Sequence, residues 1–125
     1  MKALVVRQPW ASMIAAGAKR IEVRRRRIHH RGSLLIVAGR RDAAGRVLPR
    51  SGAMSGPETL PAGVSVCTVH LVDCRPFTRA DEPAAGVAWQ PGLWAWELRD
   101  PRPTPHIPVR GQQCIFEVDL ERDKP

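Results

Sequence analysis

The sequence predicts a mainly β protein, a small closed barrel of about five or six short strands with one or two short helices. Short apolar or alternating segments recur along the chain, and they are separated by turns rich in glycine and proline. Only one segment spaces its apolar residues as a helix does. A length of 125 residues suits a single domain with one core. We expect this domain to span 1–120 and the tail 121–125 to fray.

The first elements are predicted within the first 17 residues. Leu4–Val6 reads as a short apolar strand, and a helix is expected over Pro9–Ala16. Proline is favoured at the first helical position because its missing N–H costs nothing there. Apolar residues follow Trp10 at helical spacing up to Gly17, which is a natural left-handed stop.

The other strands are predicted by short apolar or alternating runs. In chain order they are Arg20–Arg25, Ser33–Ala38, Val64–Val72, Leu93–Leu98 and Gln113–Leu120. Val64–Val72 is apolar on both faces and is therefore expected at the centre of the sheet. The segment 39–63 is expected to be a long loop with a functional role or high mobility. Prolines between 101 and 108 predict an extended connector outside any central ladder.

The charge points to a polyanionic partner. The formal net charge is +8, and 17 of the 20 basic residues are arginine. Arginine suits phosphate and guanine better than lysine does. Arg24–Arg27 is a run of four arginines that can contact phosphates or simply form a solvated face. The alternative for the whole excess is the codon bias of a GC-rich genome, which also enriches Ala, Gly and Pro.

The compartment is predicted to be the cytoplasm. The N-terminus lacks the apolar region of a signal peptide, and no apolar run is long enough to span a membrane, so no membrane partner is expected. Cys67, Cys74 and Cys114 are odd in number and are expected to be reduced thiols in or near the core. The histidines show no zinc-ligand spacing, so neither a metal nor another cofactor is predicted.

Five sequence blocks carry a family resemblance. They are Arg7-Gln-Pro-Trp-Ala-Ser, Gly17-x-Lys-x-Ile-Glu-x-Arg, Arg31-Gly-x-Leu-Leu-Ile, Leu60–Cys74 and Trp96–Gly111. In this order they resemble the ASCH domain, a small β-barrel family related to PUA domains. The resemblance implies a PUA-like barrel with a cleft between helix and sheet. RNA, DNA or a modified base is the ligand that it implies, bound beside the turn that follows Gly17.

The ligand-binding prediction rests on side chains that read bases and phosphates. These are Arg7, Gln8, Ser12, Lys19, Glu22, Arg24, Arg26, Trp96 and Glu97. A carboxylate can accept the exocyclic amine of cytosine, an arginine can take a phosphate or a guanine edge, and a tryptophan can stack on a base. The expected partner is RNA or another single-stranded nucleic acid, or a nucleotide derived from it. Each residue also has a structural alternative, such as a solvated Glu–Arg pair or a tryptophan in the core.

An enzyme is the main alternative, with Lys19 and Glu22 as its catalytic residues. Some small ASCH proteins resemble acetylcytidine amidohydrolases and others a metal-dependent ribonuclease. The amidohydrolase pattern has a threonine three residues after its lysine, where this chain has Glu22. Its third carboxylate is not placed here; Asp81, Glu82 and Glu97 are candidates.

Catalysis is expected to be weak in this pair. Lys19 and Glu22 should hold each other charged, which raises the pKa of the lysine and lowers that of the glutamate, so that both become poorer bases. We therefore expect binding with slow or absent hydrolysis. A regulatory module whose basic surface meets an acidic protein is a third alternative.

Overall fold

The computed structural model describes residues 1–51, 60–111 and 115–117. The elements in chain order are β1 (Lys2–Gln8), α1 (Trp10–Ala15), β2 (Ile21–Arg24), β3 (Gly32–Asp42), β4 (Val64–Pro76), the 3₁₀ turn η1 (Arg79–Asp81), α2 (Glu82–Ala85), β5 (Trp94–Pro103) and β6 (Ile115–Glu117). The prediction of a mainly β chain with two short helices is confirmed. In the described part of the chain no helix is long and apolar enough to cross a membrane.

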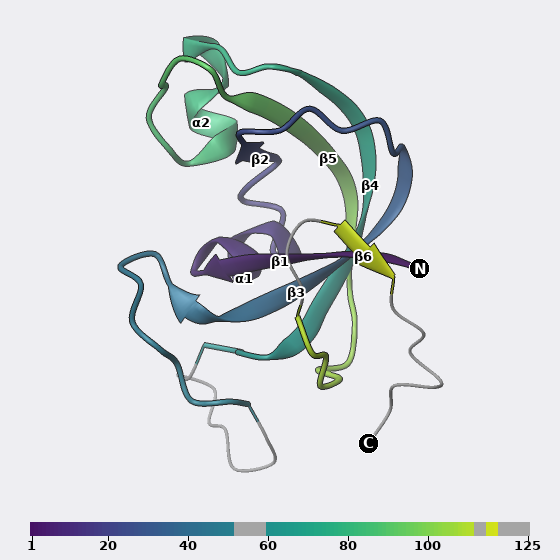
Figure 1. The fold of residues 1–125 in the computed structure, drawn as a ribbon. Coiled ribbons are helices and arrows are strands. Elements are labelled where there is room, and N and C mark those ends of the chain that lie inside the picture. The colour runs from purple at the N-terminus through teal and green to yellow at the C-terminus, as the bar shows by residue number, and fades with distance from the viewer. Residues whose placement is uncertain (52–59, 112–114, 118–125) are drawn as a thin grey trace.

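All six strands form one sheet in the order β2-β5-β4-β3-β1-β6. β1 and β3 are parallel, with α1 and β2 in the connection between them, and the other pairs are antiparallel. The sheet is strongly bent rather than flat (Figure 1). Among the described residues β2 and β6 are its edge strands and do not pair with each other. The barrel is therefore open in this part of the chain, whereas a closed one was predicted. β2 has only four residues and pairs with β5, and the described residues of β6 pair with the first half of β1.

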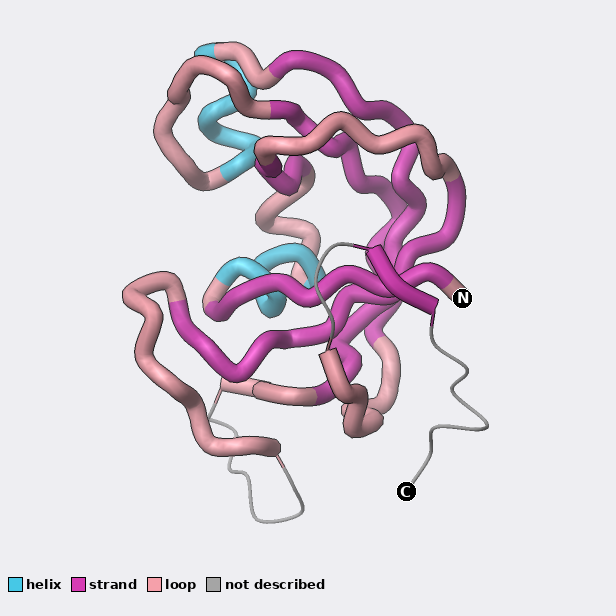
Figure 2. Tube along the Cα trace, in the orientation of Figure 1, coloured by secondary structure: helices cyan, strands magenta, loops and turns pink. Residues whose placement is uncertain are grey.

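The main core fills the inside of this bend. α1 contributes Ala11 and Ile14, and the strands contribute mostly aliphatic side chains such as Leu34, Ile36 and Leu71. Two smaller clusters lie on the other face of the sheet, one around Leu35 and Val37 and one around Ile21 and Phe77. Helices are cyan in Figure 2, where α1 lies against the strands near the middle of the molecule.

The thiols of two cysteines lie in the main core. Cys67 and Cys74 are buried and free, as expected, and Cys114 lies outside the described residues. Burial raises the pKa of the Cys67 thiol to about 12, which keeps it protonated and unreactive.

Helix α1 starts and ends within one residue of its prediction. Pro9 is the residue before the helix rather than its first residue, and the Gln8–Pro9 peptide is cis. Gly17 has φ +79°, the left-handed conformation that was expected to end the helix. The sequence thus located the turn that leads into β2.

Four strands are longer than predicted, and the first of them is β1, which covers Lys2–Gln8 where Leu4–Val6 was expected. β3 continues to Asp42, into the segment expected to be a loop, and β4 continues to Pro76. β5 runs to Pro103, which pairs with Cys67 of β4, so Pro101 and Pro103 lie in a strand where a connector was expected, although not in a central ladder. β2 covers only the first part of β5, and beyond Leu98 the strand pairs with β4 alone among the described strands. Proline is tolerated there because one side of the strand needs no N–H donor.

The last predicted strand, Gln113–Leu120, is seen as β6 over Ile115–Glu117, and the rest of that prediction and the tail 121–125 lie outside the described residues. Phe116 is buried between the exposed or half-buried residues on either side, as the alternation predicted.

The segment between β4 and β5 is fastened to the sheet by a buried carboxylate. Asp81 accepts hydrogen bonds from Arg75 Nη1 (2.7 Å) and Nη2 (2.9 Å) and from the N and Oγ1 of Thr78 (2.9 Å each). Trp89 adds a bond from Nε1 to the Phe77 carbonyl oxygen at 3.0 Å. These contacts fix α2 and the residues after it beside β2.

Candidate functional site

A pocket of about 690 Å³ opens between the start of α1, strand β2 and the segment that follows α2. Its lining residues are Val5, Arg7, Trp10, Lys19, Glu22, Val23, Arg24, Arg25, Val87, Ala88, Gln90 and Leu93. The structure therefore brings Arg7, Lys19, Glu22 and Arg24 together around one space. A concave site with an apolar lining and a few converging polar groups is the usual form of a ligand pocket.

The turn after α1 places Lys19 at the base of this pocket. The backbone N–H groups of Ala18 and Lys19 both donate to the Met13 carbonyl oxygen, at 2.9 and 3.1 Å, which folds the chain back over the end of the helix. Lys19 is 2% exposed, and its Nζ donates to the carbonyl oxygen of Ala85 at the end of α2.

Glu22 lies between two cations. Arg24 donates from Nε to Glu22 Oε2 at 2.8 Å, and its Nη2 lies 2.6 Å from the same oxygen. The other oxygen, Oε1, is 3.7 Å from Lys19 Nζ, which is longer than a hydrogen bond. Arg24 Nη2 also donates to the Val5 carbonyl oxygen at 2.8 Å, which fastens the guanidinium to β1. The trio carries one net positive charge.

Burial changes the acidity of Lys19 in the direction opposite to the one expected. The pKa of the Lys19 ammonium is lowered because removal from water disfavours its charge, and this outweighs the attraction of Glu22; Arg24 lowers it further. The sequence shows the nearby glutamate but not the helix and the tryptophan that exclude water. The expectation of a raised lysine pKa is therefore wrong.

Hydrogen-bonding capacity remains at the base of the pocket. An ammonium has three N–H donors, and within the described residues Lys19 makes one hydrogen bond, to Ala85. Over the same residues Arg24 Nη1 and Glu22 Oε1 make none. A ligand that offers both acceptors and a donor matches this arrangement.

The walls and the rim differ in chemistry. Trp10, Val23, Val87 and Leu93 supply the apolar walls, and the Trp10 ring centroid lies 5.9 Å from Lys19 Nζ. Trp10 was expected in the core; it packs against the core and also lines the pocket. At the rim Arg7 and Arg25 are exposed and form no ion pair with another described residue.

Gln8 and Ser12 form a structural link outside this pocket. Gln8 is fully buried, and its Nε2 donates to Ser12 Oγ at 2.9 Å and to the Pro61 carbonyl oxygen at 2.8 Å. Its Oε1 accepts from the backbone N–H of Ser12 at 3.0 Å. These bonds hold the end of β1 against the first turn of α1, so the amide of Gln8 is used within the fold.

The remaining predicted ligand-binding residues also lie outside the pocket lining. Trp96 is 4% exposed, and its Nε1 donates to the backbone oxygen of the exposed Arg26 at 3.0 Å. Glu97, the next residue of β5, points to the other face of the sheet, where Arg75 Nη2 is 3.7 Å away. Trp96 thus supports the backbone of the arginine run from the core.

The candidates for a third catalytic carboxylate do not line the pocket either. Asp81 is bonded to Arg75 and Thr78, and Glu82 accepts the backbone N–H of Trp89 at 2.6 Å. Across the described ranges no three His, Cys, Asp or Glu side chains gather closely enough to hold a metal ion.

Sequence reasoning missed the wall formed by 87–93. Its residues are mostly apolar but are interrupted by Gln90, Pro91 and Gly92, and Leu93 was predicted only as the start of a strand.

The fold defines the class of protein to which the chain is similar. Among solved structures, ASCH from Zymomonas mobilis matches with a TM-score of 0.66 and 16% identity, over 96% of this chain and 88% of that one. A single-residue variant of the same protein matches with a TM-score of 0.64 and 15% identity, over 94% and 89% of the two chains. At these identities the likeness establishes the fold alone.

The family follows from the sequence model of the ASCH domain, which matches residues 4–105. The chain belongs to the ASCH domain family, which is related to PUA-like RNA-binding domains. Activating signal cointegrator 1 from Mus musculus is 28% identical over 127 residues; the match covers 93% of this chain and 22% of that protein. The chain thus spans about a fifth of the length of this relative.

Proposed function

We propose that this protein binds RNA or another single-stranded nucleic acid, with one nucleotide in the pocket formed by Lys19, Glu22 and Arg24. The observation that carries the proposal is the meeting of these three side chains beside the Trp10 wall in one open pocket. A base needs an aromatic or aliphatic surface and polar groups at its edge, and the pocket offers both.

The free hydrogen-bonding atoms suit a nucleotide. Glu22 Oε1 can accept an exocyclic amine, such as that of cytosine, while Lys19 and Arg24 Nη1 can donate to a base carbonyl or a phosphate. Single-stranded nucleic acid fits better than a duplex because its bases are free to turn out and stack on a side chain.

The rim provides the electrostatic part of the interaction. Arg7, Arg25 and Arg26 are exposed around the pocket or next to it and have no acidic partner within 1–51, 60–111 and 115–117. Their charge adds to a net charge of +8, which favours any polyanion. The relationship of the ASCH family to PUA-like RNA-binding domains supports the same proposal.

The test is the affinity for a labelled six-nucleotide RNA and its DNA counterpart, measured by fluorescence anisotropy at two salt concentrations. Arg24→Gln should weaken binding about tenfold, because a charged hydrogen bond is worth about 1.5–3 kcal/mol. Arg102→Gln is the matched control, since Arg102 is exposed on β5 and lines none of the pockets described. The proposal is overturned if the wild type fails to bind at low salt, or if both variants lose affinity equally.

Hydrolysis of an acylated nucleoside is a second candidate, and the lowered pKa of Lys19 favours it. A more acidic ammonium is more often neutral, and a neutral amine can take a proton from an attacking water. In that step the water oxygen bonds to the acetyl carbon of acetylcytidine while Lys19 takes its proton; the C–N bond then breaks, the Lys19 ammonium returns the proton to the departing amine nitrogen, and acetate and cytidine leave. Fast turnover by the wild type that Lys19→Ala abolishes would establish this activity; without turnover, binding remains the function.

A further inference from the structure

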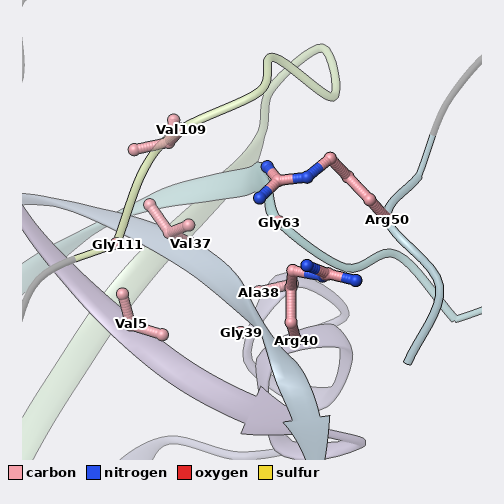
Figure 3. A pocket seen from close by; sticks show the side chains of 9 residues that line it. All are labelled: Val5, Val37, Ala38, Gly39, Arg40, Arg50, Gly63, Val109 and Gly111. Carbon is pink, nitrogen blue, oxygen red and sulfur yellow. The ribbon is translucent and has the colours of Figure 1, made fainter. Parts of the chain in front are cut away.

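A second pocket, of about 380 Å³, lies on the side of β1 that faces β3 and the segment after β5. Figure 3 shows its lining: three valines along one side, two arginines along the other, and glycines between them. The residues are Val5, Val37, Ala38, Gly39, Arg40, Arg50, Gly63, Val109 and Gly111.

The two arginines lie close together over one glycine. Gly63 has φ +72°, and a Cβ built on it would be 3.1 Å from Arg50 Nη1 and 3.5 Å from Arg40 Cγ. A larger residue would therefore crowd the Arg50 guanidinium and touch Arg40. Arg40 and Arg50 are exposed, and neither forms an ion pair with another described residue, so their charge is available to a ligand.

The backbone beneath these arginines is held in place. Gly63 donates its N–H to the Ala38 carbonyl oxygen at 2.8 Å and accepts from the Val109 N–H at 3.0 Å. The glycine thus joins β3 to the segment after β5, and the two guanidinium groups extend from a fixed base. Exposed arginines are side chains that commonly bind phosphate groups.

The opposite side of the pocket is apolar and tightly fitted around Val5. A Cβ on Gly111 would come within 2.7 Å of Val5 Cγ2, and one on Gly39 within 3.0 Å of Val5 Cγ1. Val37 and Val109 are 1% and 6% exposed and lie behind the half-buried Val5, so the three valines form one apolar side on which Val5 offers the contact for a ribose or a base.

Val5 also connects this pocket to the first one, since it lines both. Its carbonyl oxygen accepts the hydrogen bond from Arg24, while its methyl groups face the two glycines. Arg7, two residues farther along β1, projects to the same face as Val5 and lines the first pocket. The two pockets therefore adjoin across a single residue.

We propose that the second pocket binds an adjoining nucleotide of the same strand, with its phosphate on Arg40 and Arg50 and its sugar or base on the three valines. This inference rests on the proposed function, because it extends the strand held in the first pocket across Val5. Two arginines that pair with no acidic group among the described residues give the charge complementarity, and the shared valine gives the continuity.

The test separates the two pockets by ligand length. The double variant Arg40→Gln/Arg50→Gln should bind a six-nucleotide oligocytidine RNA about tenfold more weakly, with its log–log salt slope shallower by about 1.4 because two phosphate contacts are lost. Its affinity for cytidine monophosphate should be unchanged, since one nucleotide fills only the first pocket. The matched control is Arg46→Gln/Arg102→Gln, which removes the same charge from exposed residues that line neither pocket.

Each outcome assigns the result to one pocket. One outcome is that Arg24→Gln lowers the affinity for both ligands while the double variant binds as its control does. In that case the proposal for the second pocket is overturned and the proposed function stands. If the double variant lowers the affinity for the RNA while Arg24→Gln leaves both affinities unchanged, the first pocket is not a binding site and the second pocket binds the RNA without it. If the wild type binds neither ligand, both are overturned. Circular dichroism checks that the variants fold; the exposed positions of the four arginines predict that they do.

Discussion

Asp81 and Glu22 are both buried carboxylates paired with an arginine, but the protein completes the bonding of only one of them. Both oxygens of Asp81 accept hydrogen bonds, and its four donors come from Arg75 and Thr78. Glu22 receives hydrogen bonds on Oε2 alone, and its Oε1 faces Lys19 at 3.7 Å across the base of a pocket. A carboxylate with all its partners inside the protein stabilises the fold, whereas one with an open oxygen can recognise a ligand.

The largest expected effect is on stability, at the completed carboxylate. Asp81→Ala should lower the free energy of unfolding by about 2–3 kcal/mol, because it leaves Arg75 and the Thr78 N–H without their partner. Urea unfolding measures this loss. Asp73→Ala is the control, since among the described residues Asp73 makes only a 3.7 Å contact with the exposed Arg31 and one hydrogen bond from the Cys74 N–H at 2.9 Å, and its loss should cost about 1 kcal/mol or less. An equal loss of unfolding free energy in the two variants would show that the bonds of the buried Asp81 contribute no more than the contacts of Asp73.

The next effect is on binding, at the open site. Lys19→Met removes a buried ammonium and its hydrogen bond to the Ala85 oxygen, while Glu22 keeps its bond from Arg24, so the free energy of unfolding should fall by about 1–2 kcal/mol, less than in Asp81→Ala. Affinity for the six-nucleotide RNA should fall about tenfold because donors to the ligand are lost. Anisotropy and urea unfolding on the same samples make the comparison. A variant that unfolds early but binds normally when folded would show that Lys19 serves the fold alone.

The smallest effect is the dependence of stability on pH, and the two sites should differ in where it occurs. The pKa of Asp81 is held well below its usual range, first by the Arg75 hydrogen bonds. Below about pH 4 the unfolded chain therefore binds more protons there, and this stability is lost as the pH falls. The pKa of Lys19 is lowered by burial, so its contribution rises with pH as the pH approaches the free-lysine value of about 10.4.

Urea titrations at several pH values measure how the free energy of unfolding changes with pH. The wild type is compared with Asp81→Asn in the acid range and with Lys19→Met in the alkaline range. The acid slope should flatten in the first variant and the alkaline slope in the second. The same dependence in variant and wild type would show that neither group has a shifted pKa.

The difference between the two sites also explains what the sequence could and could not predict. The turn at Gly17 and the alternation of Glu22 and Arg24 are local, so the sequence placed Lys19, Glu22 and Arg24 together. Local patterns carry the spacing of residues near one another in the chain. They do not show which distant segment covers them, and the wall containing Val87 and Leu93 was missed for this reason.

Burial is the second thing that local patterns left out. Gln8 and Trp96 were expected to face a ligand, yet Pro61 and Arg26, far away in sequence, use their polar atoms. The same cause reversed the expected shift in the pKa of Lys19. Among the described residues the sheet is open, and no residue pattern in the sequence indicated whether its edge strands β2 and β6 would pair.

The hydrogen bond from Lys19 to Ala85 links the pocket to helix α2, because the same side chain lines the pocket and holds the end of the helix. The oxygen it reaches belongs to the last residue of α2, and Arg20 adds a backbone N–H to the Ala84 oxygen at 2.8 Å. A nucleotide that orders Lys19 therefore slows the local opening of α2, and deuterium exchange at Gly86 should slow when the pocket is filled. The coupling is reciprocal. A substitution that destabilises α2 should therefore lower the binding free energy of the nucleotide by the amount by which the bound nucleotide stabilises α2.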